Sequence, residues 1–319
     1  MTSGNNNHLL FGKNLAIHFT ENDDRIILIS EFIKKAIINY TSNSLNKIEI
    51  EFRIGSFYPN NLGKNSDKTN PEKSPLLSIP HCIVLPEEDK QSVKLFNFKP
   101  GLNSNFFWFL VNFLKNNKLK IDETFTEDLF DEDKSRTTYD LTTKIPIHTI
   151  IKENRSNLSI LNLGKDVRIT IVNERKIEQK LNQKIVERRK KHRFSILYEF
   201  FRFDFTHVIE MNQRNSKSVE SWEFEIEIED INFLRQYISE KNQIGNFIIF
   251  NKLICRIMNN IYSIYDIFEY QFIPSFKQIQ DESYKKNFPS NNPEVGEYIA
   301  SITYQKELMK LNEEINKYS

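Results

Sequence analysis

Apolar and charged residues alternate without a break in two stretches of this chain, residues 48–53 and 223–229. A β-strand points every second side chain to the same face. Each stretch therefore predicts a strand with a row of glutamates on one face and apolar groups on the other. Carboxylates stacked in this way repel those of neighbouring strands unless cations lie opposite them, so the pattern indicates that the chain has a use for the repulsion.

Three further stretches alternate in the same way: 167–174, 189–195 and 201–208. Their polar faces sort by charge, since Arg189, Lys191 and Arg193 share one face while the glutamate rows hold almost no basic residue. An open sheet with one solvated face would explain the alternation. A closed barrel would also explain the sorting, with apolar faces packed outward against helices and charged faces lining a tunnel. The pattern alone leaves both arrangements open.

Helical spacing of apolar residues predicts helices at 23–40, 103–115, 231–240, 245–268 and, as a short charged helix, 304–317. Strands are further predicted at 81–85, at 93–98 and in succession over 135–230. Residues 58–75 predict a long polar loop. The expected organisation is a flexible N-terminus (1–20), one main domain (21–273) and a C-terminal extension (274–319).

Composition narrows the possible partners. The 319 residues include 44 basic and 43 acidic ones, so any attraction for an anion must be local. Cys82 and Cys255 are too few for a disulfide framework or a zinc site. The polar, Asn-rich first 13 residues do not resemble a signal peptide. No stretch of about twenty uncharged apolar residues occurs, so we expect no membrane partner.

The glutamate rows offer hard oxygen ligands without His or Cys, which suits Mg²⁺ or Mn²⁺ and not zinc. A single Glu-x-Glu is a weak signal, but both occurrences here lie in strand-like alternation. The basic run 187–193 has a rival interpretation as a nuclear-import or nucleic-acid patch. It continues into 194–198 without a break, however, as a strand would.

An ordered set of motifs resembles the fungal and viral mRNA-capping RNA triphosphatases, a group of triphosphate tunnel metalloenzymes, and is closest to the yeast type. The motifs are Glu-x-Glu-x-Arg-x-Gly (49–55), Arg136, Lys152, Arg-x₅-Glu (168–174), Arg-x-Lys-x-Arg (189–193), Arg-x-Asp-x-Thr (202–206) and the final Glu-x-Glu-x-Glu. The resemblance extends from about residue 25 to 270. It implies an α+β fold, with an eight-stranded antiparallel β-barrel tunnel of charged interior and α-helices outside.

The resemblance also implies roles for individual residues. Metal ligands for Mg²⁺ or Mn²⁺ would be Glu49, Glu51 and Glu227, with Glu229 as a second choice for the last position. Phosphate-binding or catalytic cations would be Arg136, Lys152, Arg168, Arg189, Lys191 and Arg193. Glu174 would orient the attacking water, with Glu223 and Glu225 in support. Arg202, Asp204 and Thr206 would position the basic strand or only hold the wall together.

The implied activity is metal-dependent hydrolysis of the γ-phosphate of triphosphate-ended nascent RNA, the first step of mRNA capping. The chain lacks a Lys-x-Asp-Gly motif, so a separate mRNA guanylyltransferase is expected as partner. A homodimer is an implication that the sequence leaves open. The expected location is the nucleus, or a cytoplasmic viral factory. Two alternatives remain: a tunnel hydrolase of inorganic polyphosphate, thiamine triphosphate or a nucleotide, and a non-catalytic interaction module.

Overall fold

A computed structural model describes residues 18–39, 46–59, 83–86, 96–117, 119–161, 166–179, 184–212, 218–238 and 243–272. Of the loop predicted at 58–75, residues 58 and 59 instead end strand β1, and the rest lies outside the described residues. The helix predicted at 304–317 and both predicted terminal segments, apart from 18–20, also lie outside them. The elements are α1 (Asp24–Asn39), β1 (Asn46–Pro59), β2 (Ile83–Pro86), β3 (Phe96–Pro100), α3 (Ser104–Asn116), β4 (Asp122–Asp131), β5 (Ser135–Asp140), β6 (Pro146–Leu161), β7 (Asp166–Lys176), β8 (Ile185–Tyr198), β9 (Phe201–Asn212), β10 (Ser218–Ile228), α4 (Ile231–Arg235) and α5 (Gln243–Phe272).

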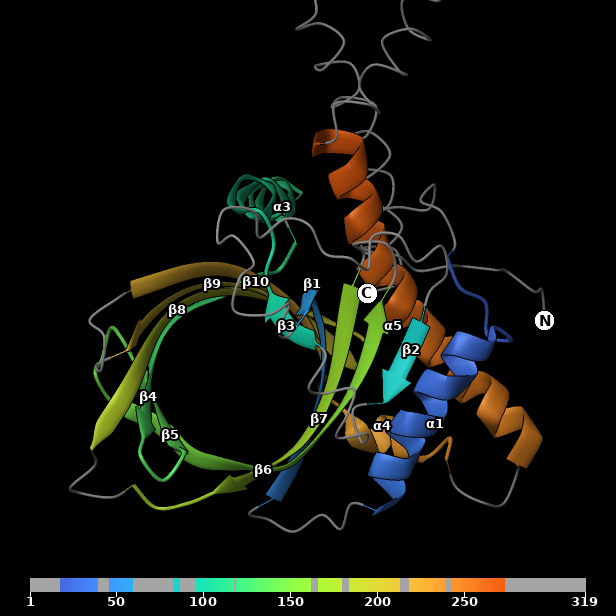
Figure 1. Ribbon diagram of the computed structural model, residues 1–319, viewed down its shortest axis with the longest axis horizontal. Helices are drawn as coiled ribbons and strands as arrows, with labels where there is room; N and C mark the ends of the chain where they lie inside the picture. Colours follow the sequence, from blue (N-terminus) through green and yellow to red (C-terminus); the bar gives the residue numbers. More distant parts are fainter. Residues whose placement is uncertain are drawn as a thin grey trace, which may run out of the picture.

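Eight antiparallel strands close into a barrel, which Figure 1 views along its opening. Their order around the barrel is β10, β9, β8, β4, β5, β6, β7 and β1, and β1 pairs back to β10. Strand β3 pairs with the last residues of β1, and β2 pairs with the end of β6. The predicted closed barrel is therefore confirmed, and the alternative of an open sheet with one solvated face is excluded.

The hydrophobic core lies outside the tunnel, between the barrel wall and the helices. On β1 the core residues are Ile48, Ile50, Phe52 and Ile54, each at most 2% exposed. Helix α3 lies outside β8–β10, and α1, α4 and α5 gather beside it, outside β1 and β7 (Figure 1). The alternating sequence dictates this inverted arrangement, because burying the apolar rows against helices sends the charged rows inward. None of the described helices has the length and apolarity needed to cross a membrane.

Helix α3 begins where the sequence predicts. The side chain of Asn103 accepts hydrogen bonds from the backbone N–H groups of Asn105 and Phe106, at 2.9 and 3.3 Å, and so caps the first turn. Helix α4 ends at Arg235, earlier than the predicted 231–240, because residues 236–238 form turns. The other helices match their predictions to within a few residues at each end.

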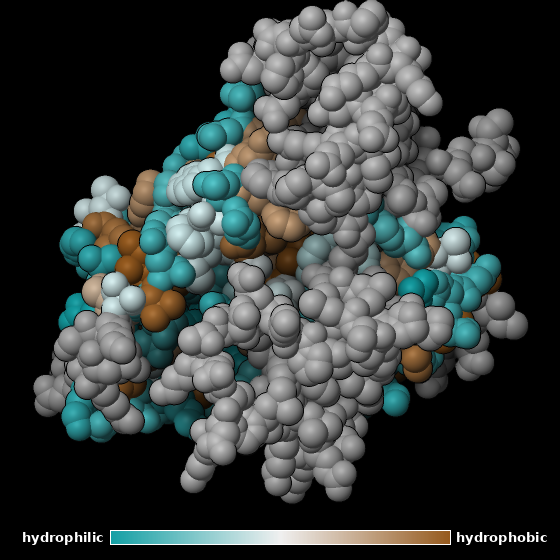
Figure 2. Space-filling model, turned by 45° about the horizontal axis from the view of Figure 1, so that its top comes forward, coloured by the Kyte–Doolittle hydropathy of each residue, from teal (hydrophilic) through white to brown (hydrophobic). Residues whose placement is uncertain are grey.

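Strand β4 is the main element that the sequence did not predict. Its outward residues include Glu123, Phe125 and Glu127, and Phe125 is 44% exposed. Among the described helices only the end of α3 reaches this strand, where Lys115 pairs with Glu123, so most of the strand needs no apolar outer row and shows no apolar alternation. Apolar residues interrupt the hydrophilic surface on the barrel side of Figure 2, in keeping with exposed Phe125 and Leu197.

Gly55 permits the close crossing of β3 over β1. A Cβ atom at this position would stand 2.3 Å from the carbonyl oxygen of Lys99 and 2.6 Å from Cζ of Phe98. We expect Gly55→Ala to lower the free energy of unfolding by about 2 kcal/mol or more, because the backbone oxygen cannot rotate away. Urea unfolding followed by circular dichroism measures the change. The neighbouring Ser56→Ala serves as control and should cost less than about 0.5 kcal/mol; equal effects would show that β3 shifts freely.

Candidate active site

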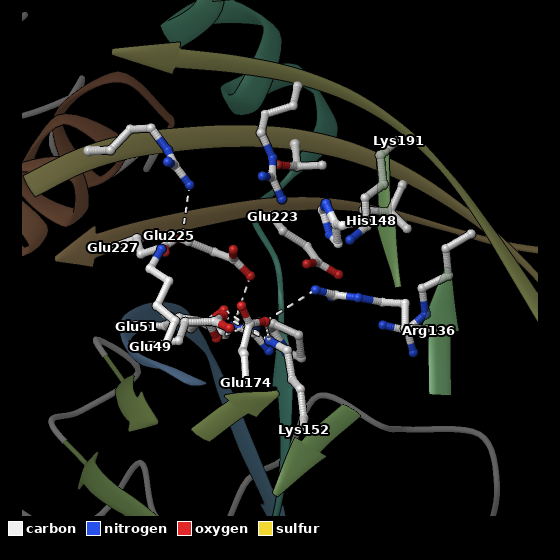
Figure 3. Close-up of a pocket in the computed structure, with 18 of the residues that line it drawn as sticks. Glu49, Glu51, Arg136, His148, Lys152, Glu174, Lys191, Glu223, Glu225 and Glu227 are labelled. Carbon is white, nitrogen blue, oxygen red and sulfur yellow. Dashed lines mark hydrogen bonds and ion pairs between the residues drawn. The ribbon is translucent and has the colours of Figure 1, made fainter. Parts of the chain in front are cut away.

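The inward faces of the barrel strands enclose a cavity of about 330 Å³, shown in close-up in Figure 3. Most of its lining is charged. The sequence-predicted residues that line it are Glu49, Glu51, Arg136, Lys152, Glu174, Arg189, Lys191, Arg193, Arg202, Thr206, Glu223, Glu225, Glu227 and Glu229. Two members of the predicted set, Arg168 and Asp204, are not among the described lining residues. The fold thus brings glutamates and cations from seven of the eight barrel strands into one space, and β4 adds Phe130.

Lys152 lies at the centre of a carboxylate cluster on the floor of the cavity (Figure 3). Its Nζ donates a hydrogen bond to Glu49 Oε1 at 2.8 Å, and lies 3.6 Å from Glu51 Oε1 and 3.4 Å from Glu174 Oε1. Glu49 and Glu51 are each only 4% exposed. The buried ammonium offsets part of the mutual repulsion of the three carboxylates.

Glu174 and Glu49 share a proton between them. Burial, and then the contact with Glu49, raise the pKa of Glu174 to about 7. Burial also acts to raise the pKa of Glu49, but the contact with Glu174 and the charges of Lys152 and Arg136 outweigh it and hold that pKa well below its usual range. Two carboxylates this close cannot both ionise readily. Below about pH 7 the pair therefore carries one proton, on Glu174, which also accepts a hydrogen bond from Arg136 Nη2 at 3.3 Å.

Arg53 joins the glutamate rows of β1 and β10. The register pairs Arg53 with Glu225 and Glu51 with Glu227. The guanidinium lies 2.6 Å from Glu51 Oε2 and 2.8 Å from Glu225 Oε1. Glu223 is the inward-facing residue of β10 that precedes Glu225, and it accepts a hydrogen bond from the Ser221 hydroxyl. Arg53 was not among the predicted site residues, although it stands within the first glutamate motif.

The register also distinguishes Glu227 from Glu229. Glu227 lies directly across from Glu51 within β10, whereas Glu229 follows the end of the strand. Glu227 accepts hydrogen bonds from Lys47 Nζ at 2.9 Å and from Arg202 Nη2 at 2.6 Å. Glu229 forms an ion pair with the same arginine. The position opposite the β1 carboxylates thus belongs to Glu227.

Asp128 on β4 orients the basic wall, and the sequence did not single it out. It is 2% exposed, its Oδ2 lies 2.6 Å from Lys191 Nζ and 3.9 Å from Arg136 Nη1, and its Oδ1 accepts from the Thr138 hydroxyl at 2.7 Å. Burial opposes ionisation of Asp128, but the charges of Lys191 and Arg136 dominate and hold its pKa well below the usual range. Burial lowers the pKa of Lys191, and Asp128 partly compensates. Asp128 therefore holds Lys191 and Arg136 in place at the edge of the cavity.

Asp204 plays the corresponding part for the arginines of β8 and β9. It is 1% exposed and accepts from Arg202 Nε at 2.8 Å and from the Ser195 hydroxyl at 2.6 Å. Arg193 lies 3.6 Å from the same carboxylate through Nη1, and its Nε donates to Thr206 Oγ1 at 3.2 Å. The buried carboxylate thus fixes two guanidinium groups that line the cavity, and that of Arg202 also pairs with Glu227 and Glu229.

Two of the predicted phosphate ligands, Arg168 and Arg189, lie over aromatic rings, unlike Lys191 and Arg193. Arg168 stacks over Phe57 and Phe98, with Cζ 5.4 and 4.7 Å from the ring centroids, on the inward face beside β3. Arg189 does line the cavity, but it lies over the ring of Phe130 at 5.1 Å. Neither position matches that of Lys191 and Arg193, which face the carboxylate cluster.

His148 on β6 is a further lining residue that the sequence did not indicate. It is half-buried near Arg136, and burial, with a smaller contribution from the Arg136 charge, lowers its pKa. The available signal was its position in β6, two inward positions before Lys152. Single histidines carry little motif information, so this signal is weak.

The oxygen donors fit a hard divalent cation. Glu49, Glu51 and Glu227 offer only carboxylate oxygens, and Glu49 Oε2 is buried without a hydrogen-bond partner. Within the described part of the chain, no three His, Cys, Asp or Glu side chains already converge as a ligand set. The reason is visible in the ion pairs, because Lys152 lies between Glu49 and Glu51 while Lys47 and Arg202 hold Glu227. A cation would take the place of these basic contacts.

Comparisons with known proteins place this site in context. The family model described as "mRNA capping enzyme, beta chain" matches residues 20–266. The solved structure of S. pombe Pct1 RNA triphosphatase is similar, with a TM-score of 0.61 and 19% identity over 76% of this chain and 92% of that chain. Pct1 in complex with the Spt5 CTD gives the same TM-score and identity over 76% and 93%.

A Mimivirus capping enzyme triphosphatase matches with a TM-score of 0.38 and 14% identity, over 72% of this chain and 100% of that chain. No curated protein sequence matches. The likeness to Pct1 establishes a shared fold, and the family match covers the barrel from α1 into α5.

Proposed function

The chain belongs to the family of mRNA capping enzyme beta chains, the mRNA triphosphatases, and from that premise we propose how its tunnel removes the γ-phosphate of triphosphate-ended RNA. The protein is an RNA 5′-triphosphatase, and its products are diphosphate-ended RNA and inorganic phosphate. One observation carries the proposal: a closed tunnel holds a carboxylate cluster and a wall of oriented cations around one 330 Å³ cavity. The alternative of an open, non-catalytic charged surface does not fit this enclosure.

Four cations are placed to bind the phosphate chain: Arg136, Lys152, Lys191 and Arg193. Each reaches the cavity, and buried Asp128 and Asp204 hold three of them in place. Hydrolysis of a phosphoanhydride spreads negative charge over the phosphate oxygens, so fixed positive charge in an enclosed site lowers the barrier. The basic wall thus stabilises the transition state without rearranging during the reaction.

Glu174 is the group that handles the water proton. A carboxylate with a pKa of about 7 is poised to accept a proton near neutral pH. It lies beside Lys152 and Arg136, and so close to the phosphate-binding groups. Glu174 orients the attacking water for an in-line displacement, and Glu223 and Glu225 line the same cavity from β10, two strands away from β7.

Glu49, Glu51 and Glu227 are the residues that would hold Mg²⁺ or Mn²⁺, and the cation would supply charge neutralisation on the γ-phosphate oxygens. Their register and their oxygen-only chemistry support this assignment. A cation held there would offset the charge of these carboxylates that Lys152 now offsets, and Lys152 lines the cavity within reach of the phosphate chain.

The shared proton predicts that cation binding depends on pH. Because Glu174 is protonated below its pKa of about 7 and a cation nearby favours its ionised form, we expect the affinity for Mn²⁺ to fall below neutrality, at most about tenfold per pH unit. Calorimetric titration with Mn²⁺ at pH 6 in buffers of different ionisation enthalpy measures the released proton. Glu174→Gln should abolish that release. Binding that releases no proton from the unaltered protein would contradict a protonated Glu174.

Phosphate release tests the activity itself. The assay uses triphosphate-ended RNA with Mg²⁺ or Mn²⁺, beside inorganic tripolyphosphate and ATP, and beside a reaction with chelator. We expect cation-dependent release of one phosphate per RNA end, with kcat/KM highest for RNA. Better turnover of tripolyphosphate or ATP would favour the polyphosphate or nucleotide alternative. A folded protein that hydrolyses no triphosphate with either cation would refute the proposal.

Partners and location are proposed on the same basis. The nucleotidyl-transfer step belongs to a guanylyltransferase outside these 319 residues, and a homodimer is testable by light scattering. The nucleus is the proposed location, with a cytoplasmic viral factory if the chain is viral. The basic run 187–193 gives no support for a nuclear location, because it is part of strand β8 and not an exposed import signal. It sends Arg189, Lys191 and Arg193 into the cavity.

A further inference from the structure

Arg189 and Phe130 form a stacked pair at the end of the tunnel where β4 turns into β5. The guanidinium carbon lies 5.1 Å from the centroid of the Phe130 ring, and both residues line the cavity. We propose that Arg189, backed by Phe130, is the surface on which the first base of the triphosphate-ended RNA stacks. This inference rests on the proposed function and names the nucleoside subsite of the same tunnel.

Two of the three guanidinium nitrogens of Arg189 are already engaged. Its Nε donates to Glu187 Oε1 at 2.6 Å, and its Nη2 lies 3.1 Å from Glu210 Oε2. Two carboxylates around one guanidinium leave a net negative charge, which disfavours a phosphate at this position. The same two contacts hold the guanidinium plane still. The pair is therefore built as a flat surface and not as a phosphate ligand.

The location fits the nucleoside end of the substrate. Along β8 the inward residues follow in the order Arg189, Lys191 and Arg193, and each step of two residues spans about 7 Å. Phe130 is the last inward-facing residue of β4 before the turn. Arg189 has a side chain that is 36% exposed, against 14% for Lys191. Phosphates held by Lys191 and Arg193 would thus place the attached nucleoside beside Arg189.

The chemistry of the pair predicts its selectivity. Arginine planes and aromatic rings stack on any nucleobase, since every base presents a π face. The subsite therefore favours nucleoside-bearing triphosphates over inorganic ones without selecting a base sequence. Lysine in place of Arg189 keeps the charge and loses the plane, and leucine in place of Phe130 keeps the apolar volume and loses the ring.

The test compares kcat/KM for triphosphate-ended RNA and for inorganic tripolyphosphate in Arg189→Lys and Phe130→Leu. We expect each variant to lose about tenfold more on RNA than on tripolyphosphate, mainly through KM, in line with the effect of removing one base-stacking group. Phe130→Tyr keeps the aromatic ring, so its ratio of kcat/KM for RNA to kcat/KM for tripolyphosphate should equal that of the unaltered protein. Phe125→Leu is the matched control, because Phe125 lies on the outward face of the same strand and is stacked on His192.

Equal losses on both substrates would overturn the inference, because they would mean that Arg189 serves the phosphates or the wall. An unchanged ratio with unchanged activity would place the base elsewhere. Equilibrium binding of the RNA and of tripolyphosphate measures the same ratio without turnover. If the unaltered protein hydrolyses neither substrate, the proposed function fails, while the binding ratio still decides the role of Arg189. Thermal melting of each variant confirms that the barrel is intact.

Discussion

Replacement of Glu49 by alanine is expected to reduce kcat/KM for triphosphate-ended RNA by about a thousandfold or more, the scale of losing a group that places charge at the reacting phosphate. Glu49 is nearly fully buried, bonds Lys152 and shares a proton with Glu174. In the proposed mechanism, its loss would remove a cation ligand and disturb Glu174, the group proposed to orient water. Single-turnover phosphate release at saturating Mn²⁺ measures the effect on the chemical step.

The control for Glu49→Ala is Glu153→Ala. Glu153 is also a strand glutamate with a basic partner, Arg175, but its side chain is 41% exposed and outside the cavity lining. We expect kcat/KM of this variant to stay within about twofold of the value for the unaltered protein, since exposed ion pairs contribute little to stability. Glu49→Ala should remain folded, because Lys152 retains Glu51 and Glu174 as partners. Full activity in a folded Glu49→Ala protein would remove this residue from the site.

Replacing each of the adjacent lysines Lys190 and Lys191 on β8 should have very different effects on kcat/KM. Lys191→Ala is expected to lower kcat/KM by about a hundredfold to a thousandfold, because Lys191 contributes a positive charge that Asp128 fixes in the basic wall. Lys190→Ala should change it by less than about twofold, because that side chain is exposed on the opposite face of the same strand. The same phosphate-release assay measures both, and equal effects would contradict the inward orientation of Lys191.

Stability must be separated from activity in this comparison. Removing Lys191 leaves buried Asp128 with Thr138 and a more distant Arg136, which we expect to cost about 3 kcal/mol of folding free energy. The double variant Lys191→Met with Asp128→Asn removes the uncompensated charge. Its stability should recover towards the original value in urea unfolding, while its activity stays low. Recovery of both would mean that Lys191 acts only on the fold.

Much of the tunnel could be predicted because it follows from alternation. Strand β1 alone carries both an apolar row that meets the helices and the carboxylates Glu49 and Glu51 that meet the cavity. Pattern alone could not choose between a barrel and an open sheet, since closure depends on a pairing between β1 and β10 that leaves no local mark. The resemblance to a family of tunnel enzymes supplied that choice.

The parts that sequence could not supply are those set by tertiary contact. Asp128 lies on a strand whose outer face is uncovered, so no periodic signal pointed to it. The central position of Lys152 among three carboxylates depends on how β6 meets β7 and β1. The stacking of Arg189 on Phe130 arises because neighbouring strands bring the two side chains together. None of these follows from spacing along the chain.

The pairing that closes the barrel also shapes how the protein is made. Lys47 and Glu227, which are bonded across this closure, lie 180 residues apart in sequence. During synthesis β1 emerges first, yet its partners β7 and β10 emerge much later. Contacts of such long separation slow folding, and an unpaired strand edge is prone to pair with other chains. The nascent protein must therefore keep β1 from aggregating until nearly the whole wall exists.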